Sequence, residues 1–227
     1  MFESRQDALA VVEGLSEPSK MPCYGYSLPR SACQMGMLMA AKNPEGICGK
    51  CYAKMGNYTF KHVQDAMNRR MDAIQDPRWV DAMVYLIGSE RYFRWHDSGD
   101  IQGVWHLKNI AEIARRTPDT KHWLPTREYQ IVKEYIEEMK QLARAKHRQL
   151  RSFIPSNLII RLSATTFEGK APSALAKGLG VLVSSVSRAE YTCLAPKQNN
   201  KCGNCRACWD TNIFEITYKR HRTGKRK

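Results

Sequence analysis

The sequence predicts an α/β fold on a parallel sheet, as a small or incomplete (β/α)8 barrel with cysteine-rich metal-binding segments. Short apolar runs that resemble strands alternate with longer runs of helical periodicity through the middle of the chain. This alternation is typical of parallel sheets. Polar residues suited to chemistry follow the ends of those strands, where parallel folds place their sites. A complete barrel usually needs ~250 residues, and with 227 residues we expect a reduced one.

Hydrophobic periodicity defines the expected elements in chain order. Residues 1–20 are expected to form a helical or loosely held lead-in. Residues 62–90 carry apolar side chains at helical spacing, and Asp76-Pro77 divides them into two helices, with Arg69 and Arg70 on a solvated face. The remaining predictions are helices at 103–116 and 128–145, and strands at 92–95, 122–126, 158–163 and 181–186.

The composition is that of one globular domain. Hydrophobic residues make up 43% of the chain and charged residues 26%, which is ordinary for such a domain. We expect a single domain over residues 1–218, followed by a basic disordered tail at 219–227. No apolar run approaches the ~20 residues of a membrane span, and the first 20 residues lack the apolar core of a signal peptide. We therefore expect a cytoplasmic protein without a membrane partner.

The charge balance predicts a polyanionic partner. Lys and Arg total 36 against 22 Asp and Glu, which leaves +14, a surplus that suits DNA. Mere solubility is the alternative explanation. Six of the positive charges lie in the tail at 219–227, a segment suited to phosphate contacts of low sequence specificity.

A dense group of functional side chains follows the aromatic strand at 92–95. Loops at the carboxyl ends of parallel strands are the usual place for catalytic groups. The alternative is an Asp/Ser/Gly turn that caps the next helix. The number of functional side chains in seven residues favours chemistry, and the candidates in this loop are His96, Asp97, Ser98, Gly99, Asp100 and Gln102.

The C-terminal cysteines form the stronger of two metal motifs. One cysteine, eight intervening residues and then Cys-x-x-Cys-x-x-Cys place four thiolates at spacings that suit a tetrahedral zinc site. An iron–sulfur cluster fits the same four thiolates. We expect zinc in a structural role, because nothing else in the sequence demands redox chemistry; the ligands would be Cys193, Cys202, Cys205 and Cys208.

A second group of cysteines lies near the N-terminus. Its last two members form Cys48-Gly-Lys-Cys51, a spacing that metal knuckles use. The gaps before Cys48 are less regular, and buried apolar thiols are the alternative for the first two cysteines. The candidate second metal site is Cys23, Cys33, Cys48 and Cys51.

Two motifs resemble those of the tRNA-guanine transglycosylases. Asp97-Ser-Gly-Asp-Ile-Gln102 is similar to their Asp-Ser-Gly-Gly-aromatic-Gln motif, and Trp123-Leu-Pro-Thr-Arg127 resembles a Leu-Pro-Thr-Arg stretch in the same enzymes. The C-terminal cysteine cluster is similar in place and kind to their zinc site. From Cys23 to Trp209 the chain resembles the short phage relatives of that family, the DNA 7-deazaguanine transglycosylases.

The resemblance implies a zinc-containing barrel enzyme that exchanges guanine in DNA for a 7-deazaguanine base and so protects phage DNA from restriction in the host cytoplasm. It places the purine-side acid or base at Asp97, with Arg127 among the substrate-binding residues. Lys121 stands where the family has its nucleophilic aspartate, and Asp100 replaces a glycine of the motif. Asp100 is therefore the candidate nucleophile for a double displacement at C1′.

Stacking on a displaced base would use aromatic side chains near this loop. Trp95, Trp105 and Trp123 are the candidates, and core packing is the alternative role for each. Two other functions stay open at this point. One is a zinc-stabilised, non-catalytic DNA-binding protein, and the other is an iron–sulfur, radical-type enzyme on a similar barrel.

Overall fold

The computed structural model describes residues 2–150 and 153–221. It has an α/β architecture with one six-stranded, all-parallel sheet in the order β1-β2-β3-β4-β5-β6. The strands are β1 (Gly25–Tyr26), β2 (Tyr92–Trp95), β3 (Lys121–Thr126), β4 (Leu158–Ser163), β5 (Leu182–Ser187) and β6 (Glu215–Lys219). The α-helices are α1 (Arg5–Val12), α2 (Gln34–Lys42), α3 (Lys61–Ala73), α4 (Trp79–Ile87), α5 (Val104–Arg116), α6 (Tyr129–Ala145) and α7 (Ser173–Leu179).

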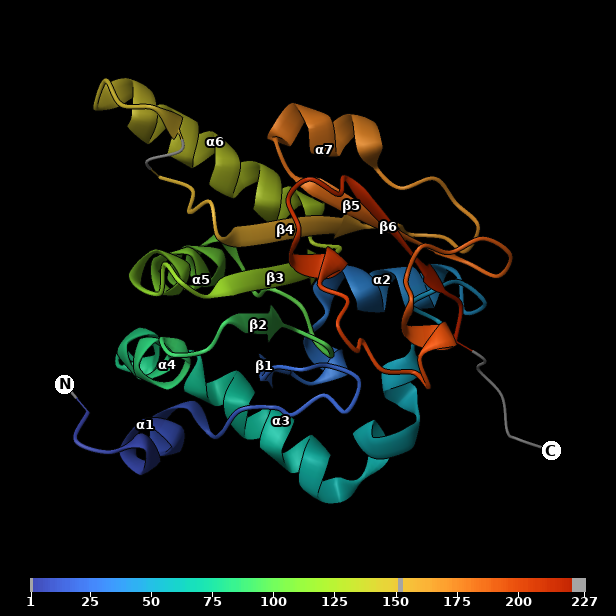
Figure 1. The fold of residues 1–227 in the computed structure, drawn as a ribbon, viewed down its shortest axis with the longest axis horizontal. Coiled ribbons are helices and arrows are strands. Elements are labelled where there is room, and N and C mark those ends of the chain that lie inside the picture. Colours follow the sequence, from blue (N-terminus) through green and yellow to red (C-terminus); the bar gives the residue numbers. More distant parts are fainter. Residues whose placement is uncertain (1, 151–152, 222–227) are drawn as a thin grey trace.

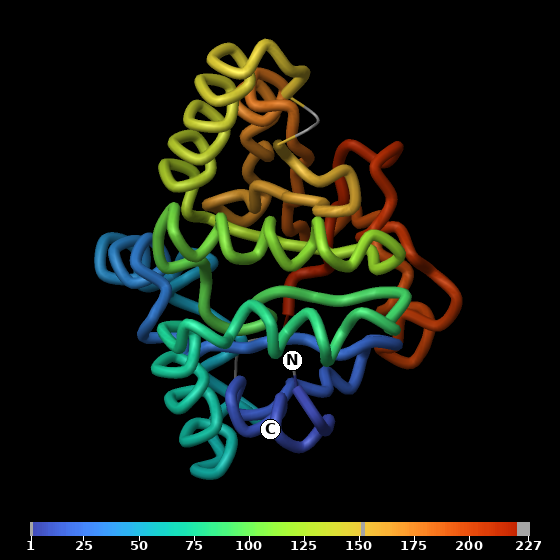
Figure 2. Tube along the Cα trace, turned by 90° about the vertical axis from the view of Figure 1, so that its left-hand side faces the viewer, coloured from blue at the N-terminus to red at the C-terminus, as the bar shows by residue number. Residues whose placement is uncertain are grey.

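The sequential strand order determines where the helices lie. Parallel crossovers are right-handed, and each one here advances by a single strand in the same direction. The connecting helices therefore cover one face of the sheet. Figure 1 shows α4, α5 and α6 along that face, and Figure 2 views the molecule from their side. Within the described residues no pairing joins β1 to β6, and the arrangement is compatible with a partial α/β barrel.

The main hydrophobic core lies between these helices and the sheet. Alternate strand residues supply its sheet side, because successive side chains of a strand point to opposite faces. They include Phe93 and Trp95 of β2, Leu124 of β3, Ile160 of β4 and Val183 of β5. The helices contribute apolar stripes of the kind that the periodicity predicts, such as Leu107, Ile110, Ala111 and Ala114 of α5.

The other face of the sheet is covered by the C-terminal segment, which Figure 1 shows on the side away from α4 and α5. Trp209 is buried, and its indole Nε1 donates to the Phe93 carbonyl at 2.9 Å. Arg161 of β4 is fully buried. Its guanidinium donates to the carbonyls of Cys208 (3.1 Å), Asp210 (2.8 Å) and Ile213 (2.9 Å), among others. One arginine thus organises the turn that carries the last cysteine.

Most predicted elements are confirmed. The strands at 92–95 and 158–163 match β2 and β4, and the break at Asp76-Pro77 separates α3 from α4. The two edge strands, β1 and β6, and the helices α2 and α7 were not predicted. β1 has only two residues and α7 only seven, and elements so short carry little periodic signal.

The expectation of a solvated face for Arg70 is wrong. Its side chain is buried, and its guanidinium donates to the carbonyls of Gly14 (3.0 Å) and Leu15 (3.1 Å) and to Ser16 Oγ (3.1 Å). A long arginine side chain can extend from its helix and donate hydrogen bonds to the carbonyls of a neighbouring loop. The helical periodicity of the sequence does not predict such contacts. Arg69 remains at the surface, in a 2.8 Å ion pair with Glu13.

The prediction of a disordered tail from residue 219 is wrong for the first residues of that range. Lys219 is the last residue of β6, and the Arg220 amide donates to the Ser187 carbonyl at 2.8 Å. Residues 222–227, which hold the rest of the predicted tail, lie outside the described residues. Among the helices that the structure describes, none has both the length and the apolar character needed to cross a membrane.

Candidate active site

The loop after β2 folds tightly against the segment after β1. His96 has a φ of 51° and Gly99 a φ of 80°, so the backbone enters the left-handed region twice. Glycine is required at position 99, because a Cβ there would stand 2.4 Å from Leu28 Cβ. The Leu28 amide donates to the Ser98 carbonyl at 2.9 Å. These contacts place the loop at the carboxyl edge of the sheet.

Asp97 is buried and held by hydroxyl groups from other segments. Ser27 Oγ donates to Asp97 Oδ1, and Tyr58 OH donates to Oδ2 at 2.7 Å. Tyr52 OH donates to the Asp97 backbone carbonyl. Tyr52 and Tyr58 lie in the short 3₁₀ turns η2 (Tyr52–Lys54) and η3 (Gly56–Thr59). Both carboxylate oxygens thus accept hydrogen bonds from side-chain hydroxyls.

Asp100 is held more rigidly. Its Oδ1 accepts from the Ile101 amide at 2.9 Å and from Thr126 Oγ1 at 2.6 Å, and its Oδ2 accepts from the Arg127 amide at 3.0 Å. Burial raises the pKa of Asp100, and the hydrogen bonds from Arg127 and Thr126 act in the opposite direction. The Asp100 carboxylate therefore joins the two motifs directly. It belongs to Asp97–Gln102 and accepts hydrogen bonds from Thr126 and Arg127 of the motif Trp123–Arg127.

The predicted substrate-binding residues differ in whether their polar side chains already make hydrogen bonds within the protein. Gln102 Nε2 donates to the carbonyls of Ala32 (2.9 Å) and Asp100 (2.6 Å), which ties the loop to the segment before α2. In contrast, Ser98 Oγ is buried and has no hydrogen-bond partner among the described residues. Ser98 is thus the better-placed group to bond a ligand, because Gln102 already uses its amide donors.

His96 is buried, and neither of its ring nitrogens has a hydrogen-bond partner among the described residues. Its ring lies 5.3 Å, centroid to centroid, from that of His106. Burial lowers the pKa of His96 from 6.5 to about 4, so the ring is neutral at physiological pH. A neutral imidazole beside Asp97 can donate or accept a hydrogen bond without adding charge.

Glu128 is a carboxylate of this site that sequence reasoning missed. Its Oε1 accepts from the Met35 amide at 2.8 Å, next to the start of α2. Burial raises the pKa of Glu128, and the charge of Asp100 raises it further. Its neighbour Arg127 uses its Nε to donate to the Ala164 carbonyl at 2.9 Å. The signal in the sequence that could have identified Glu128 is its position two residues after the end of β3.

The three candidate stacking residues differ in exposure. Trp95 and Trp123 are buried, and the guanidinium of Arg94 covers the Trp123 ring at 4.6 Å. Trp105 is 38% exposed and stacks on His106 at 5.3 Å. Core packing therefore accounts for Trp95 and Trp123, and Trp105 keeps a face available for stacking.

The C-terminal cysteines lie near one another. Burial raises the pKa of Cys202, and the neighbouring Cys193 and Cys205 raise it further. The Cys205 amide donates to the Cys202 carbonyl at 3.0 Å, and the Cys208 Sγ lies 3.3 Å from Tyr218 OH. The donor set suits zinc or an iron–sulfur cluster in its chemistry.

The N-terminal cysteines differ in the charged groups that surround their thiols. Burial raises the pKa of Cys33, and Asp100, Cys51 and Cys48 raise it further. For Cys23, burial is again the main cause of a raised pKa, but the thiol that acts on it is Cys202 of the C-terminal group.

No three His, Cys, Asp or Glu side chains of the described residues converge closely enough, as they stand, to hold one metal ion. The cysteine ligand sets thus stay predictions.

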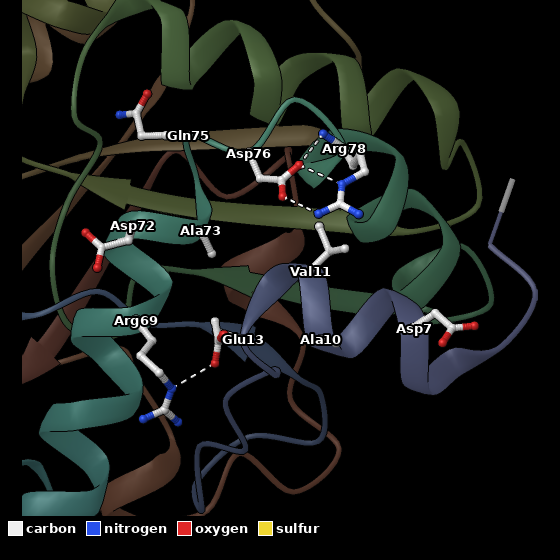
Figure 3. Close-up of a pocket in the computed structure, with 10 residues that line it drawn as sticks. All are labelled: Asp7, Ala10, Val11, Glu13, Arg69, Asp72, Ala73, Gln75, Asp76 and Arg78. Carbon is white, nitrogen blue, oxygen red and sulfur yellow. Dashed lines mark hydrogen bonds and ion pairs between the residues drawn. The ribbon is translucent and has the colours of Figure 1, made fainter.

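Two cavities differ in their relation to this site. The larger, about 720 Å³, lies among α1, α3 and the start of α4 (Figure 3). Its two arginines pair with its own carboxylates, Arg69 with Glu13 and Arg78 with Asp76, so we assign it no role. The smaller, about 300 Å³, is lined by residues that include Met35, Cys48 and Thr165, and it adjoins Glu128 through Met35.

Comparison with known proteins matches the chain to a family. The family model described as Gene product 88 matches residues 2–211. No curated protein and no solved structure matches the chain.

Proposed function

We propose that this chain, which belongs to the Gene product 88 family, is a base-exchanging transglycosylase that replaces guanine in DNA with a 7-deazaguanine. The observation that carries the proposal is the meeting of two motifs at the carboxyl edge of the sheet. Asp100, from the Asp-Ser-Gly-Asp-Ile-Gln loop, accepts hydrogen bonds from Thr126 Oγ1 and the Arg127 amide of the second motif. This edge is where parallel folds carry catalysis.

The reaction needs a carboxylate at C1′ and a group that carries a proton to and from the base. A carboxylate oxygen of Asp97 bonds to C1′ as the C1′–N9 bond breaks, and the electron pair leaves with guanine, which takes a proton from Glu128. The incoming 7-deazaguanine then gives a proton to Glu128. Its N9 bonds to C1′ while the bond from C1′ to Asp97 breaks.

Geometry supports this assignment over a nucleophilic Asp100. Both oxygens of Asp100 are occupied, and two of the three donors are backbone amides that cannot rotate away. Among the described residues, the carboxylate of Asp97 accepts only from the hydroxyls of Ser27 and Tyr58. Glu128 suits proton transfer because burial raises its pKa, toward the range in which a carboxyl exchanges protons near neutral pH.

DNA as the substrate is supported by the net charge of +14. A base inside a duplex must leave the stack to reach a buried carboxylate, or be presented single-stranded. Trp105 offers a partly exposed ring for that base. Zinc would serve this enzyme as a structural ion bound by the C-terminal cysteines.

Nucleoside analysis tests the proposal in cells. DNA from cells that express the protein and receive a 7-deazaguanine supply should contain the modified deoxynucleoside. DNA from cells expressing Asp97→Asn at equal levels should not. The same amount of modified nucleoside in both would remove Asp97 from the reaction, and none in either at high expression would contradict the proposal.

A further inference from the structure

We infer that Cys33, Cys48 and Cys51 form a metal-binding site of three thiolates with one coordination position left open, and that Cys23 belongs with the C-terminal cysteines instead. The eight cysteines thus divide as three and five. The inference does not depend on the transglycosylase reaction, because it concerns which ligands share a metal.

The first observation is the close packing at Gly36, in the first turn of α2. A Cβ at this position would lie 3.7 Å from Cys33 Sγ and 3.8 Å from Cys48 Sγ. A Cβ would also stand 2.8 Å from Cys33 Cβ, so glycine at position 36 lets the first turn of α2 pack directly against Cys33 and near Cys48. With thiolate–metal bonds of about 2.3 Å, a change of side-chain rotamer can close these thiols on an ion.

The second observation is the tight turn that carries the other two cysteines. The Cys51 amide donates to the Cys48 carbonyl at 3.3 Å, and Lys54 Nζ donates to the Gly49 carbonyl at 2.7 Å. A Cβ on Gly49 would lie 2.0 Å from the Pro44 carbonyl oxygen, so only glycine fits. The backbone of this Cys-x-x-Cys knuckle is thus fixed by packing.

The open position follows from the number of ligands and from the surroundings. Three protein ligands leave the fourth tetrahedral position free, as in catalytic metal sites. Cys48 lines the cavity of about 300 Å³, which has room for a further ligand. Three thiolates favour Zn²⁺ or an iron–sulfur cluster over hard ions.

The placement of Cys23 excludes it as the missing ligand. The Cys202 amide donates to the Lys20 carbonyl at 2.8 Å, which fixes the C-terminal loop beside the segment that leads to Cys23. Cys23 follows Lys20 by only three residues, so its segment lies against the loop that carries Cys202, and the N-terminal knuckle keeps three thiols of its own.

Metal analysis of the full-length protein tests the division. We would measure zinc, iron and sulfide per chain in the parent protein and in Cys23→Ser, Cys48→Ser and Cys51→Ser. Cys48→Ser and Cys51→Ser should each lose one whole centre, and Cys23→Ser should keep it. Loss of the same centre in Cys23→Ser, or full metal content in Cys48→Ser, would overturn the inference. Zinc without sulfide identifies an ion, and iron with sulfide identifies a cluster.

A matched pair of glycine variants separates loss of the metal from loss of the fold. In Gly36→Ala the new Cβ would meet Cys33 Cβ at 2.8 Å, so the segment that carries Cys33 must shift. It should lose the same centre at unchanged helix content by circular dichroism, whereas Gly178→Ala, where a Cβ meets nothing within 4 Å, should keep it. For the open position, the visible spectrum of the Co²⁺-loaded parent protein should change when imidazole is added, and this change should be absent in Cys48→Ser. An unchanged parent spectrum, or the same change in Cys48→Ser, would mean that the N-terminal centre has no open position.

Discussion

At the scale of single residues, the two aspartates of the loop after β2 differ in how they are held. Asp97 accepts hydrogen bonds from two hydroxyls, and Asp100 accepts from one hydroxyl and two backbone amides. Backbone donors cannot adapt to a substituted side chain, so the same Asp→Asn change should act differently at the two positions.

Asp100→Asn should lower stability. One oxygen becomes an amide that faces a fixed N–H donor, either Arg127 or Ile101, and leaving such a donor unpaired costs about 1–3 kcal/mol. Urea unfolding of the purified variant measures this cost. Asp119→Asn is the matched control, because Asp119 is exposed in the turn before β3. Equal unfolding midpoints for the two variants would show that the three hydrogen bonds of Asp100 do not contribute to stability.

Buried histidines should make the fold sensitive to acid. Burial lowers the pKa of His96 from 6.5 to about 4 and that of His122 to about 3. A lowered pKa favours the neutral form in the folded state, so this stability is complete above pH 6.5 and falls as the pH drops toward 4. Each such histidine contributes a slope of about 1.4 kcal/mol per pH unit.

His96→Asn tests the slope, since asparagine tolerates the positive φ at this position. Its free energy of unfolding, measured from pH 7.5 to 4.5, should fall less steeply than that of the parent protein. The two slopes should differ by about 1.4 kcal/mol per pH unit, the effect of one bound proton. His62→Gln, at an exposed position, should keep the parent slope. Asp100, whose pKa is raised, acts in the opposite sense but equally in both proteins. Identical slopes for His96→Asn and the parent would contradict the buried, neutral His96.

At the scale of elements, Arg161 of β4 fixes the segment after β5. Its guanidinium donates to carbonyls on both sides of Trp209. Arg161→Met should leave these carbonyls without a donor and release the segment. We expect faster tryptic cleavage at Lys197 and Lys201, which are exposed, and a decrease of at least about 2 kcal/mol in unfolding free energy. Arg144→Met on the exposed side of α6 should change neither, and resistance of Arg161→Met to trypsin would rule out this role.

Elements with regular periodicity were predictable from the sequence, and their tertiary contacts were not. Strand β4 and helix α6 follow directly from apolar runs and helical spacing. The loop at 96–100 was located correctly at a strand end. Glu128 was missed because its role depends on the Met35 amide, 93 residues away in sequence. Arg161 and Arg70 were missed because buried arginines that bond to carbonyls have no periodic signature. The grouping of Cys23 with Cys33, Cys48 and Cys51 used sequence proximity alone and stays a prediction.

At the scale of the whole molecule, the positive charge should govern binding to DNA. Truncation after His221 removes four basic residues, Arg222, Lys225, Arg226 and Lys227. Affinity should fall about equally for all DNA sequences, and the slope of log K against log salt should decrease by up to ~0.9 for each phosphate that is no longer neutralised. Fluorescence anisotropy with labelled duplexes over a range of salt measures both. An unchanged slope would show that these residues do not bind DNA.

Exchange of isotopically labelled guanine into DNA tests the base-exchange reaction directly. A reversible double displacement at C1′ must accept guanine as the entering base as well as the leaving one, so the natural 7-deazaguanine need not be known. The purified protein should incorporate label into single-stranded or duplex DNA. Asp97→Asn should reduce the rate at least ~10²-fold, and Asp119→Asn should leave it unchanged. Absence of label in DNA with the folded, metal-loaded parent protein would contradict base exchange.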